Sequence, residues 1–347
     1  MRIAVALSGG VDSSLAAALL KEQGHDVVGV TLQQWPREDE NDTARHGGCC
    51  SVSAVEDARR VANLLDIPYF VWNLEREFGE RVIKPFHQAY LEGRTPNPCL
   101  RCNQFVRFDL MLERVIALGF EALATGHYAR ILPGPELHMA TDPLKDQSYV
   151  LYHLDRDRLG RIVLPLGEMT KVEVRARAAE IGLPVADKPD SQEICFVPPG
   201  KTADYLATRL PVAAGLVVDR SGRALGTHRG TALYTVGQRT GFASLSEPGP
   251  WYVLKVEPGA NRLVVGRRDD LGASRVELGE VSFIDGEPSG PVACEARLRY
   301  RARPVRAIYS EGVLELCEPV GAVAPGQAAV LYQGTRVLGG GTIIAAT

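Results

Sequence analysis

The chain lacks the signals of several common classes of protein. No apolar run reaches the length of a membrane-spanning helix, and no secretory signal precedes the strand-like segment that begins at Arg2. Two nucleotide-binding patterns are also absent, G-x-x-x-x-G-K-[ST] of P-loop NTPases and G-x-G-x-x-G of dinucleotide enzymes. Low-complexity segments and convincing internal repeats are missing as well. We therefore expect a cytoplasmic enzyme without a membrane partner that belongs to neither of these nucleotide-binding classes.

The cysteine content argues against a disulfide framework. Seven cysteines are an odd number, and they are spread over 347 residues without a secretory signal, so thiols kept for chemistry, metal binding or the core are expected. A second C-x-x-C or an H-x-x-x-H that would complete a structural zinc site with Cys99 and Cys102 is absent. The four other cysteines are expected to be structural, Cys49 and Cys50 before a helix and Cys294 and Cys317 in the core of the β region.

The length and the distribution of charge indicate several domains. A chain of 347 residues exceeds the usual span of one domain. The net charge is −3, but residues 1–205 carry −6 and residues 206–347 carry +3, so the basic part is C-terminal. After about residue 205, alternating strands and helices give way to short β-type segments between turn signals. We expect a catalytic domain over 1–205, a linking β domain over 206–272 and a C-terminal β-barrel over 273–347.

The first part of the chain predicts an α/β fold. Four short apolar runs, at 3–7, 27–32, 69–72 and 122–125, have the composition of strands that are buried on both faces. Amphipathic helices are expected near 53–65, 109–118 and 171–181. Such alternation predicts a doubly wound parallel sheet with a ligand at the C-terminal ends of its strands.

The most informative segment joins the first strand to the next helix, and it reads Ser8-Gly-Gly-Val-Asp-Ser-Ser14. Paired glycines allow a tight turn that brings backbone N–H groups near a ligand. The serine hydroxyls stand at the start of a helix, where the helix dipole favours negative charge. The junction therefore predicts a site for the phosphates of ATP, and the alternative is a tight turn capped by serine and aspartate.

The string S-G-G-x-D-S resembles the pyrophosphate loop of the N-type ATP pyrophosphatases, which split ATP into AMP and pyrophosphate while adenylating a substrate. The resemblance implies ATP and Mg²⁺ as cofactors, with Asp12 near the magnesium ion. Leu32 would pack on adenine or simply fill the core, and Gly126 would let the backbone approach the nucleotide. The residues expected to bind the nucleotide are Ala6, Leu7, Ser8, Gly9, Gly10, Val11, Asp12, Ser13, Leu32 and Gly126.

Three cysteines lie in segments that favour thiol chemistry. Cys99 and Cys102 follow Thr95-Pro-Asn-Pro98, where two prolines predict a stiff, extended approach. Arg101 between them favours a reactive thiolate. Cys195 follows a polar loop, although an isolated cysteine of this kind also fits a buried core thiol.

Seven strings together sharpen the resemblance, which is to the bacterial tRNA-specific 2-thiouridylases and covers the whole chain. They lie in family order at 8–13, 95–98 with 102–103, 124–130, 145–149, 192–196, 234–239 and 299–301. The resemblance implies a tRNA-uridine 2-sulfurtransferase that makes 2-thiouridine at the wobble position. In that family the uridine C2 oxygen attacks the α-phosphate of ATP, and persulfide sulfur then replaces the activated oxygen as AMP leaves.

Two cysteines are catalytic by this resemblance. Cys195 matches the persulfide carrier, and Cys102 matches the nucleophile that takes part in releasing the sulfur, ending in a Cys102–Cys195 disulfide or passing through hydrogen sulfide. Cys99 departs from one version of the family pattern, in which some members have an aspartate proposed to handle protons. A rival hypothesis is therefore a 4Fe-4S cluster held by Cys99, Cys102 and Cys195.

The resemblance also implies contacts with tRNA. Asn97, Pro98 and Cys99 would line the target base, and His127 would face the tRNA or the phosphates unless it is only a strand-end histidine satisfied by the backbone. The other expected tRNA contacts are Lys145, Asp146, Gln147, Arg299, Tyr300 and Gln327. The alternative for 145–147 is a solvated loop.

An alternation of arginines extends this expectation in the basic C-terminal part. Arg297, Arg299, Arg301 and Arg303 recur with a period of two, which in a strand places all four on one face. Such a row matches a row of phosphates, and the alternative is a solvated strand face. Tyr300 would then point the other way unless the strand bends.

The partners implied by the family are tRNAs of the Lys, Glu and Gln type and a cysteine desulfurase or sulfur-relay protein, with the enzyme working as a monomer. Two other functions explain less of the sequence. A different ATP pyrophosphatase, whether RNA-thiolating or a small-metabolite adenylating synthetase, leaves Cys102, Cys195 or the basic β region without a role. The second alternative, an RNA-binding barrel fused to a nucleotide-sensing domain, gives the pyrophosphate loop no catalytic role.

Overall fold

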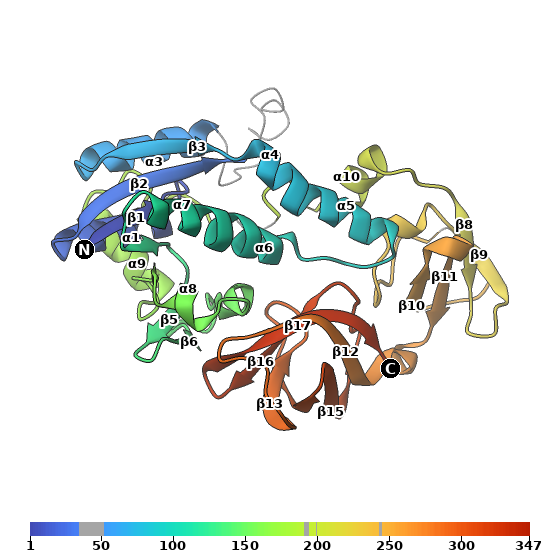
Figure 1. The fold of residues 1–347 in the computed structure, drawn as a ribbon. Coiled ribbons are helices and arrows are strands. Elements are labelled where there is room, and N and C mark those ends of the chain that lie inside the picture. The colour runs from blue at the N-terminus through green and yellow to red at the C-terminus, as the bar shows by residue number, and fades with distance from the viewer. Residues whose placement is uncertain (35–51, 191–193, 199, 243–244) are drawn as a thin grey trace. The chain divides into compact units, whose positions relative to one another are not determined.

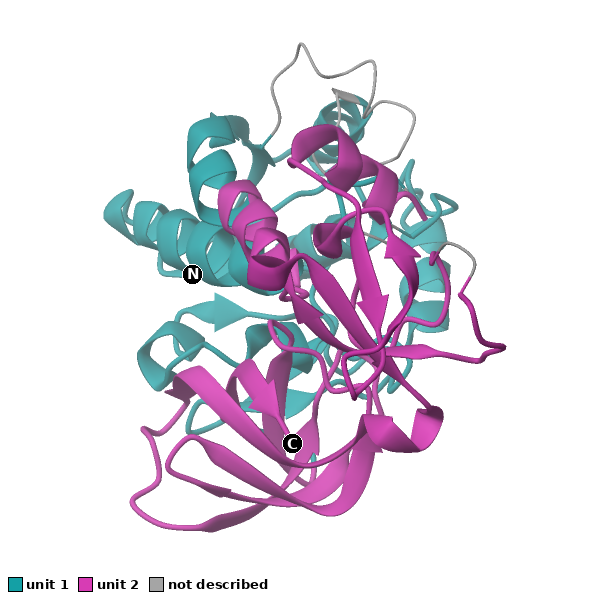
Figure 2. Ribbon diagram, turned by 90° about the vertical axis from the view of Figure 1, so that its right-hand side faces the viewer, with its two compact units in different colours: residues 1–82, 99–199, 335–337 teal, residues 83–98, 200–334, 338–347 magenta. Residues whose placement is uncertain are grey.

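The structure is a computed structural model that describes residues 1–34, 52–190, 194–198, 200–242 and 245–347. The chain divides into two compact units, coloured separately in Figure 2. Unit 1 consists of residues 1–82, 99–199 and 335–337, and unit 2 of residues 83–98, 200–334 and 338–347. The expected division into three domains, with its boundaries, stays a prediction.

Unit 1 is built on a parallel sheet in the strand order β3-β2-β1-β4-β7 (Figure 1). The strands are β1 (Arg2–Ala6), β2 (Asp26–Gln33), β3 (Tyr69–Asn73), β4 (Ala122–Ala124) and β7 (Ile162–Val163). The predicted α/β fold with a parallel sheet is confirmed. Burial of β3 on both faces was a wrong prediction, because β3 is an edge strand on which Phe70 is 55% exposed.

Helices connect these strands and supply the core of unit 1. The longer ones are α1 (Val11–Glu22), α3 (Val52–Leu64) and α9 (Lys171–Glu180), and the shorter ones are α4 (Glu75–Phe78), α7 (Leu112–Ala117) and α8 (Arg156–Leu159). The α3 helix contacts β2 and β3, whereas α1 packs against α9. Leu15, Ala58 and Val174 from these three helices are fully buried with Ile3 and Val5 of β1. This core holds the loop between β1 and α1 against the C-terminal ends of the strands.

The cysteine motif lies on a helix that begins at Pro98, after residues 94–97, which have no regular secondary structure. The α6 helix (Pro98–Arg101) continues into the π-helix η3 (Cys102–Met111) and then into α7, so helical structure starts well before the predicted 109–118. The reason is that Pro98 occupies the first turn, where a proline loses no hydrogen bond and its fixed φ suits a helix. Cys99 and Cys102 therefore project from one helical segment.

A small hairpin completes unit 1. It consists of β5 (Ala129–Leu132) and β6 (Glu136–Met139) and is followed by the 3-10 turn η4 (Ser148–Leu151). Residues 335–337 belong to the same unit because Arg336 pairs with His138 of β6 and the Met139 N–H donates to the Thr335 carbonyl at 2.8 Å.

Unit 2 begins with α5 (Lys84–Leu91), preceded by the π-helix η2 (Gly79–Ile83), and continues with α10 (Thr202–Arg209). A four-stranded sheet follows in the order β10-β11-β8-β9. Its strands are β8 (Gly215–Val218), β9 (Ala224–His228), β10 (Tyr252–Glu257) and β11 (Arg262–Gly266), with the short turns η5 (Thr231–Leu233), η6 (Pro258–Ala260) and η7 (Arg268–Leu271). The β-rich character expected after residue 205 is confirmed.

The C-terminal part of unit 2 is a closed β-barrel, as predicted. Six strands follow the order β12-β15-β14-β13-β16-β17, and pairing of β12 with β17 closes the barrel. They are β12 (Gly272–Phe283), β13 (Val292–Arg297), β14 (Val305–Ser310), β15 (Val313–Gly321), β16 (Ala328–Gln333) and β17 (Arg336–Ala346). Val276, Ala296, Leu314 and Ile343 are fully buried inside it.

The predicted row of four arginines on one strand face is wrong. The β13 strand ends at Arg297, and residues 298–301 form a turn in which Arg301 has a φ of +62°. Arg297 lies over the Tyr332 ring at 4.9 Å, while Arg299, Arg301 and Arg303 are exposed. A period of two has this geometric meaning only where the backbone stays extended.

None of the helices in the described part of the chain is long and apolar enough to cross a membrane.

Candidate functional site

The loop between β1 and α1 is ordered by its own serines. The Ser8 N–H donates to Ser13 Oγ at 3.1 Å, while the Ser13 and Ser14 hydroxyls donate to the Gly10 carbonyl at 3.2 and 2.9 Å. Gly10 is the N-cap of α1 and provides no side chain to cap the first turn. The N–H groups of that turn are therefore available to an anion at the positive end of the helix dipole.

Two glycines allow the close approaches on which this loop depends. Gly9 has a φ of +68°, and a Cβ there would lie 2.2 Å from the Ala54 carbonyl oxygen. A Cβ on Gly126 would lie 2.6 Å from the Ser13 backbone nitrogen, so the chain after β4 touches the loop directly. Gly126 thus lies beside the loop, and its role in nucleotide binding stays a prediction.

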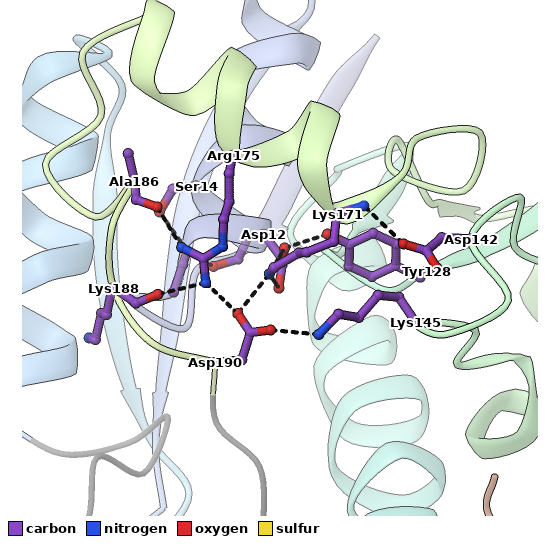
Figure 3. A network of polar contacts seen from close by, with 12 residues as sticks. Asp12, Ser14, Tyr128, Asp142, Lys145, Lys171, Arg175, Ala186, Lys188 and Asp190 are labelled. Carbon is purple, nitrogen blue, oxygen red and sulfur yellow. Dashed lines mark hydrogen bonds and ion pairs between the residues drawn. The ribbon is translucent and has the colours of Figure 1, made fainter.

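Asp12 is held from two sides (Figure 3). The Lys171 ammonium lies 2.7 Å from Asp12 Oδ1 and 2.9 Å from Oδ2, and the Tyr128 hydroxyl donates to Oδ1 at 2.7 Å. Burial, the charge of Asp12 and this hydrogen bond all raise the pKa of Tyr128, so the phenol stays protonated and keeps donating. The carboxylate is therefore fixed at the start of α1 with its charge balanced by Lys171.

Asp190 joins Lys171 to two more cations (Figure 3). Its carboxylate lies 2.9 Å from the Lys171 ammonium, 2.6 Å from that of Lys145 and 2.8 Å from the Arg175 guanidinium. Burial alone would raise the pKa of Asp190, but the hydrogen bonds from Lys145 and Lys171 and their charges outweigh it and lower the pKa to about 2. Asp190 is therefore ionised throughout the physiological range.

Lys188 approaches the loop from the other side. Its ammonium donates to the Gly9 carbonyl at 2.9 Å and lies 2.7 Å from Asp57 Oδ2. With Lys171 at Asp12, the loop is flanked by two lysines whose charges are balanced by carboxylates.

Six members of this cluster were not predicted from the sequence: Asp57, Tyr128, Lys171, Arg175, Lys188 and Asp190. Tyr128 and Asp190 fall inside or next to strings that point to the family, which is a usable signal. Lys171 occupies the first position of α9, where a cation opposes the helix dipole. A lysine at the N-terminus of a predicted helix is unfavourable there, and this signal could have marked Lys171 as functional.

Cys102 and Cys195 both belong to unit 1. The buried Gln34 amide donates to Cys102 Sγ at 3.8 Å. Phe196, next to Cys195, packs edge-on against Phe78 with ring centroids 6.0 Å apart, and Phe78 ends α4, which contacts η3. Both thiols are half-buried. Their catalytic roles and their pairing stay predictions.

The donor set for a metal cluster is not assembled in the described part of the chain. No three His, Cys, Asp or Glu side chains there lie close enough together to hold one metal ion. Cys99 is exposed, whereas Cys102 and Cys195 are half-buried. The described residues therefore do not show the iron–sulfur cluster, which stays a hypothesis. For Mg²⁺, Asp12 offers one carboxylate beside the loop, which suits an ion that takes its other ligands from phosphates and water.

His127 is buried and neutral. Its Nδ1 lies 2.7 Å from the Thr125 hydroxyl, and burial, reinforced by the charge of Arg107, lowers its pKa to about 3. Burial also lowers the pKa of His153 to about 3. The Phe108 ring of η3 lies near both imidazoles. His127 is thus buried between the end of β4 and η3. Its contact with tRNA stays a prediction.

The Lys145–Gln147 loop is anchored internally. Asp146 is 5% exposed and accepts hydrogen bonds from the Ala140 N–H at 3.1 Å and the Ser148 hydroxyl at 3.0 Å. Gln147 accepts from the Tyr128 N–H at 3.0 Å. The loop is therefore connected to Asp12 through Tyr128 and to Asp190 through Lys145, and it is not simply a solvent-exposed loop.

The remaining expected tRNA contacts lie elsewhere. Arg299 is exposed, Tyr300 is half-buried, and Asn97, Pro98 and Gln327 belong to unit 2. Leu32 is buried in β2.

The four cysteines expected to be structural fall into three groups. Cys294 is buried in the barrel, where burial raises its pKa to about 11, in agreement with a core thiol. Cys317 is exposed, which corrects its expected place in the core. Cys49 and Cys50 lie outside the described residues.

Family models match three consecutive parts of the chain. Residues 1–199 match a model described as a tRNA methyl transferase HUP domain, and residues 203–267 one described as a tRNA methyl transferase PRC-barrel domain. Residues 274–343 match an aminomethyltransferase beta-barrel domain.

Relatives match over the full length. The tRNA-specific 2-thiouridylase MnmA of Acidothermus cellulolyticus is 48% identical over 99% of this chain and 97% of its own. The protein of the same name from Moorella thermoacetica is 47% identical over 98% of each chain. A solved 4-thiouridine synthetase–RNA complex with bound ATP is 19% identical over 60% of this chain and 50% of its own, with a TM-score of 0.38.

Proposed function

Because the chain belongs to the family of tRNA-specific 2-thiouridylases, we propose that it is an ATP-dependent tRNA-uridine 2-sulfurtransferase that converts the wobble uridine to 2-thiouridine. The observation that carries this proposal is similarity at 48% identity over 99% of the chain. The loop geometry and the two half-buried thiols in unit 1 support it independently.

ATP is proposed to bind with its pyrophosphate end at the Ser8–Ser14 loop. The first-turn N–H groups of α1 and the ammonium groups of Lys171 and Lys188 would face the phosphates. Mg²⁺ would be held by Asp12 and by phosphate oxygens, and it would neutralise phosphate charge. Gly126 would keep the loop open to the nucleotide by leaving room beside Ser13.

Sulfur transfer is proposed to follow adenylation of the base at its C2 oxygen. The terminal sulfur of a persulfide on Cys195 would attack C2, and AMP would leave with the former C2 oxygen. The Cys102 thiolate would then attack Cys195 Sγ and break the S–S bond, leaving 2-thiouridine and a Cys102–Cys195 disulfide that a thiol reductant restores. Each step balances without a metal centre.

The sulfur donor is proposed to be a cysteine desulfurase or a relay protein, with tRNAs of the Lys, Glu and Gln type as substrates. The proposed cellular location is the cytoplasm and the proposed state a monomer.

Mass analysis of tRNA nucleosides tests this function. Purified protein is incubated with unmodified tRNA, ATP, Mg²⁺ and sulfide, and 2-thiouridine is expected only when ATP is present. A methylated nucleoside formed with a methyl donor, and no thiolated one, would instead favour the activity that the family descriptions name.

Cys195→Ser tests the carrier role. The variant should lose thiolation from a persulfide donor and keep tRNA-dependent ATP–pyrophosphate exchange, because adenylation needs no thiol. Cys317→Ser, at an exposed cysteine of the barrel, is the matched control and should keep both activities. Thiolation that survives in Cys195→Ser would show that this residue does not carry the sulfur.

A further inference from the structure

Gln34 is a polar residue at a position that burial would normally give to an apolar one. It directly follows β2, and it is only 2% exposed. A buried amide costs free energy unless its polar atoms are hydrogen-bonded. Gln34 Nε2 lies 3.8 Å from Cys102 Sγ and donates to it. Burial of this amide therefore places a hydrogen-bond donor beside a thiol that the proposed reaction uses.

The backbone that carries Gln34 is fixed by its neighbour. Gln33 ends β2 in register with β3, and its carbonyl accepts from the Leu74 N–H at 2.8 Å. The Gln33 side chain donates to Glu75 Oε1 at 2.6 Å. Gln34 therefore leaves a paired strand at the C-terminal edge of the parallel sheet, the same edge from which the Ser8–Ser14 loop starts.

Cys102, the acceptor, lies in a turn that is fixed as well. It starts the π-helix η3, and a residue on each side of it is tied to the π-helix η2. Arg101 Nε donates to the Arg81 carbonyl at 3.0 Å, and Arg81 Nη1 donates to the Phe105 carbonyl at 3.2 Å. The Arg101 guanidinium also lies over the Phe105 ring, 4.6 Å from its centroid. The fold itself therefore holds both donor and acceptor in place.

We propose that Gln34 is a further catalytic residue of sulfur transfer, which orients the Cys102 sulfur and stabilises negative charge on it. The inference rests on the proposed function, since it takes Cys102 as the nucleophile that breaks the persulfide S–S bond. A neutral thiol is a weak acceptor, whereas a hydrogen bond to an ionised acceptor is about twice as strong as one between neutral groups. The Gln34 N–H therefore favours the thiolate over the thiol.

Gln34 itself makes and breaks no covalent bond. The Cys102 thiolate attacks Cys195 Sγ and forms the disulfide, while the electron pair of the broken S–S bond stays on the sulfur that has been transferred to the base. Stabilising the thiolate speeds this attack, because intrinsic nucleophilicity falls less steeply than the thiolate fraction rises, with a Brønsted slope of about 0.4–0.5. A donor that is already in place needs no reorganisation when the attack occurs.

The alkylation rate of Cys102 tests this role directly. Gln34→Met removes the N–H and keeps an unbranched side chain of similar length. Wild type and variant are reduced, freed of reductant and treated with iodoacetamide, and the peptides that contain Cys102 and Cys317 are followed separately by mass spectrometry. Cys102 should react on the order of tenfold more slowly in the variant. The exposed Cys317 should react at the wild-type rate. An unchanged Cys102 rate would overturn the proposal.

Gln33→Leu is the matched control for the end of β2. It removes a neighbouring amide whose partner is Glu75 and not a sulfur, so the Cys102 alkylation rate should stay at the wild-type value. Gln34→His returns a ring N–H at a similar distance from the backbone and should recover part of the rate that Gln34→Met loses. Equal slowing in Gln34→Met and Gln34→His would show that packing and not the donor sets the rate, which would refute the assignment.

Thiolation assays separate this inference from the proposed function. In a single turnover with a persulfide donor, Gln34→Met should form 2-thiouridine on the order of tenfold more slowly and keep the wild-type rate of tRNA-dependent ATP–pyrophosphate exchange. If the wild-type protein makes no 2-thiouridine with any sulfur source, the proposed function fails. If it is active and Gln34→Met, shown to be folded by circular dichroism, alkylates and thiolates at the wild-type rates, only the role of Gln34 fails.

Discussion

Lys171 carries a positive charge that the dipole of its own helix disfavours and that carboxylates from other segments stabilise. It begins α9 after the N-cap Thr170, where the helix dipole disfavours a cation, and its side chain is only 11% exposed. The ammonium is compensated by Asp12 and Asp190 at 2.7 and 2.9 Å. Lys171 in turn neutralises the negative charge of these two carboxylates.

Replacing Lys171 by Met should destabilise the protein. The change leaves Asp12 and Asp190 with one shared cation fewer, and we expect the free energy of unfolding to fall by about 1–2 kcal/mol, less than for a fully buried pair because both carboxylates are partly exposed. Urea denaturation measures this difference. Lys201→Met, at an exposed lysine, should change the stability little, and an equal loss in both variants would contradict the argument.

Gly126→Ala should block nucleotide binding. The added Cβ would lie 2.6 Å from the Ser13 nitrogen and must displace the backbone of the loop. We expect the Kd for ATP, measured by calorimetry, to rise at least about tenfold, which corresponds to about 1.4 kcal/mol. Gly290→Ala adds a Cβ in open space and should bind ATP normally. An unchanged Kd for ATP in Gly126→Ala would show that the nucleotide does not bind at this loop.

At the scale of elements, the positions of the strands in the parallel sheet were predicted correctly, although the edge strand β3 is less buried than expected, whereas the ends of elements were not. The apolar runs specified the parallel sheet, because strands between helices must be apolar. The start of a helix at Pro98 was not predicted, since proline suits the first turn of a helix as well as an extended segment. Nothing in the local sequence separates those two uses of proline.

The turn after β13 gives an element-level prediction for tRNA binding. Arg299 is exposed on this turn in the basic part of the chain. If it contacts a phosphate, Arg299→Ala should weaken tRNA binding and reduce the slope of log K against log salt by about one unit. Filter binding at several salt concentrations measures the slope. Arg268→Ala, in the turn η7, is the control, and identical slopes for both variants would exclude Arg299 as a phosphate contact.

At the scale of the whole molecule, two buried neutral imidazoles make stability depend on pH. The pKa values of His127 and His153 are lowered to about 3, mainly by burial, whereas an unfolded histidine titrates near about 6.5. The unfolded chain therefore binds more protons between these values. Their stabilising contribution is complete above about pH 6.5 and is lost progressively as the pH falls toward about 3.

His153→Phe should weaken this dependence. Each buried histidine contributes at most about 1.4 kcal/mol of lost stability per pH unit below about pH 6.5, and the variant should lose one such contribution. Urea unfolding of wild type and variant between about pH 7.5 and about pH 5.5 measures the two slopes. Parallel slopes would mean that His153 is protonated in the folded protein.

The candidate site could be predicted from the sequence only in part, because several of its residues lie far apart along the chain. The Ser8–Ser14 loop is contiguous, so its role was visible in a single string. Lys171 and Asp190 reach Asp12 only after folding, and no local spacing connects them. The contact of Thr95 with Gln327 spans most of the chain and likewise has no sequence signature.

The chain passes repeatedly between its two units, and this affects how it is made. Residues 335–337 complete unit 1, although residues 200–334 of unit 2 precede them. The hydrogen bond from Met139 to Thr335 therefore cannot form until the last strand has emerged from the ribosome. The edge of β6 that faces away from β5 therefore stays unpaired while residues 140–335 are synthesised, and an unpaired strand edge favours aggregation in a nascent chain.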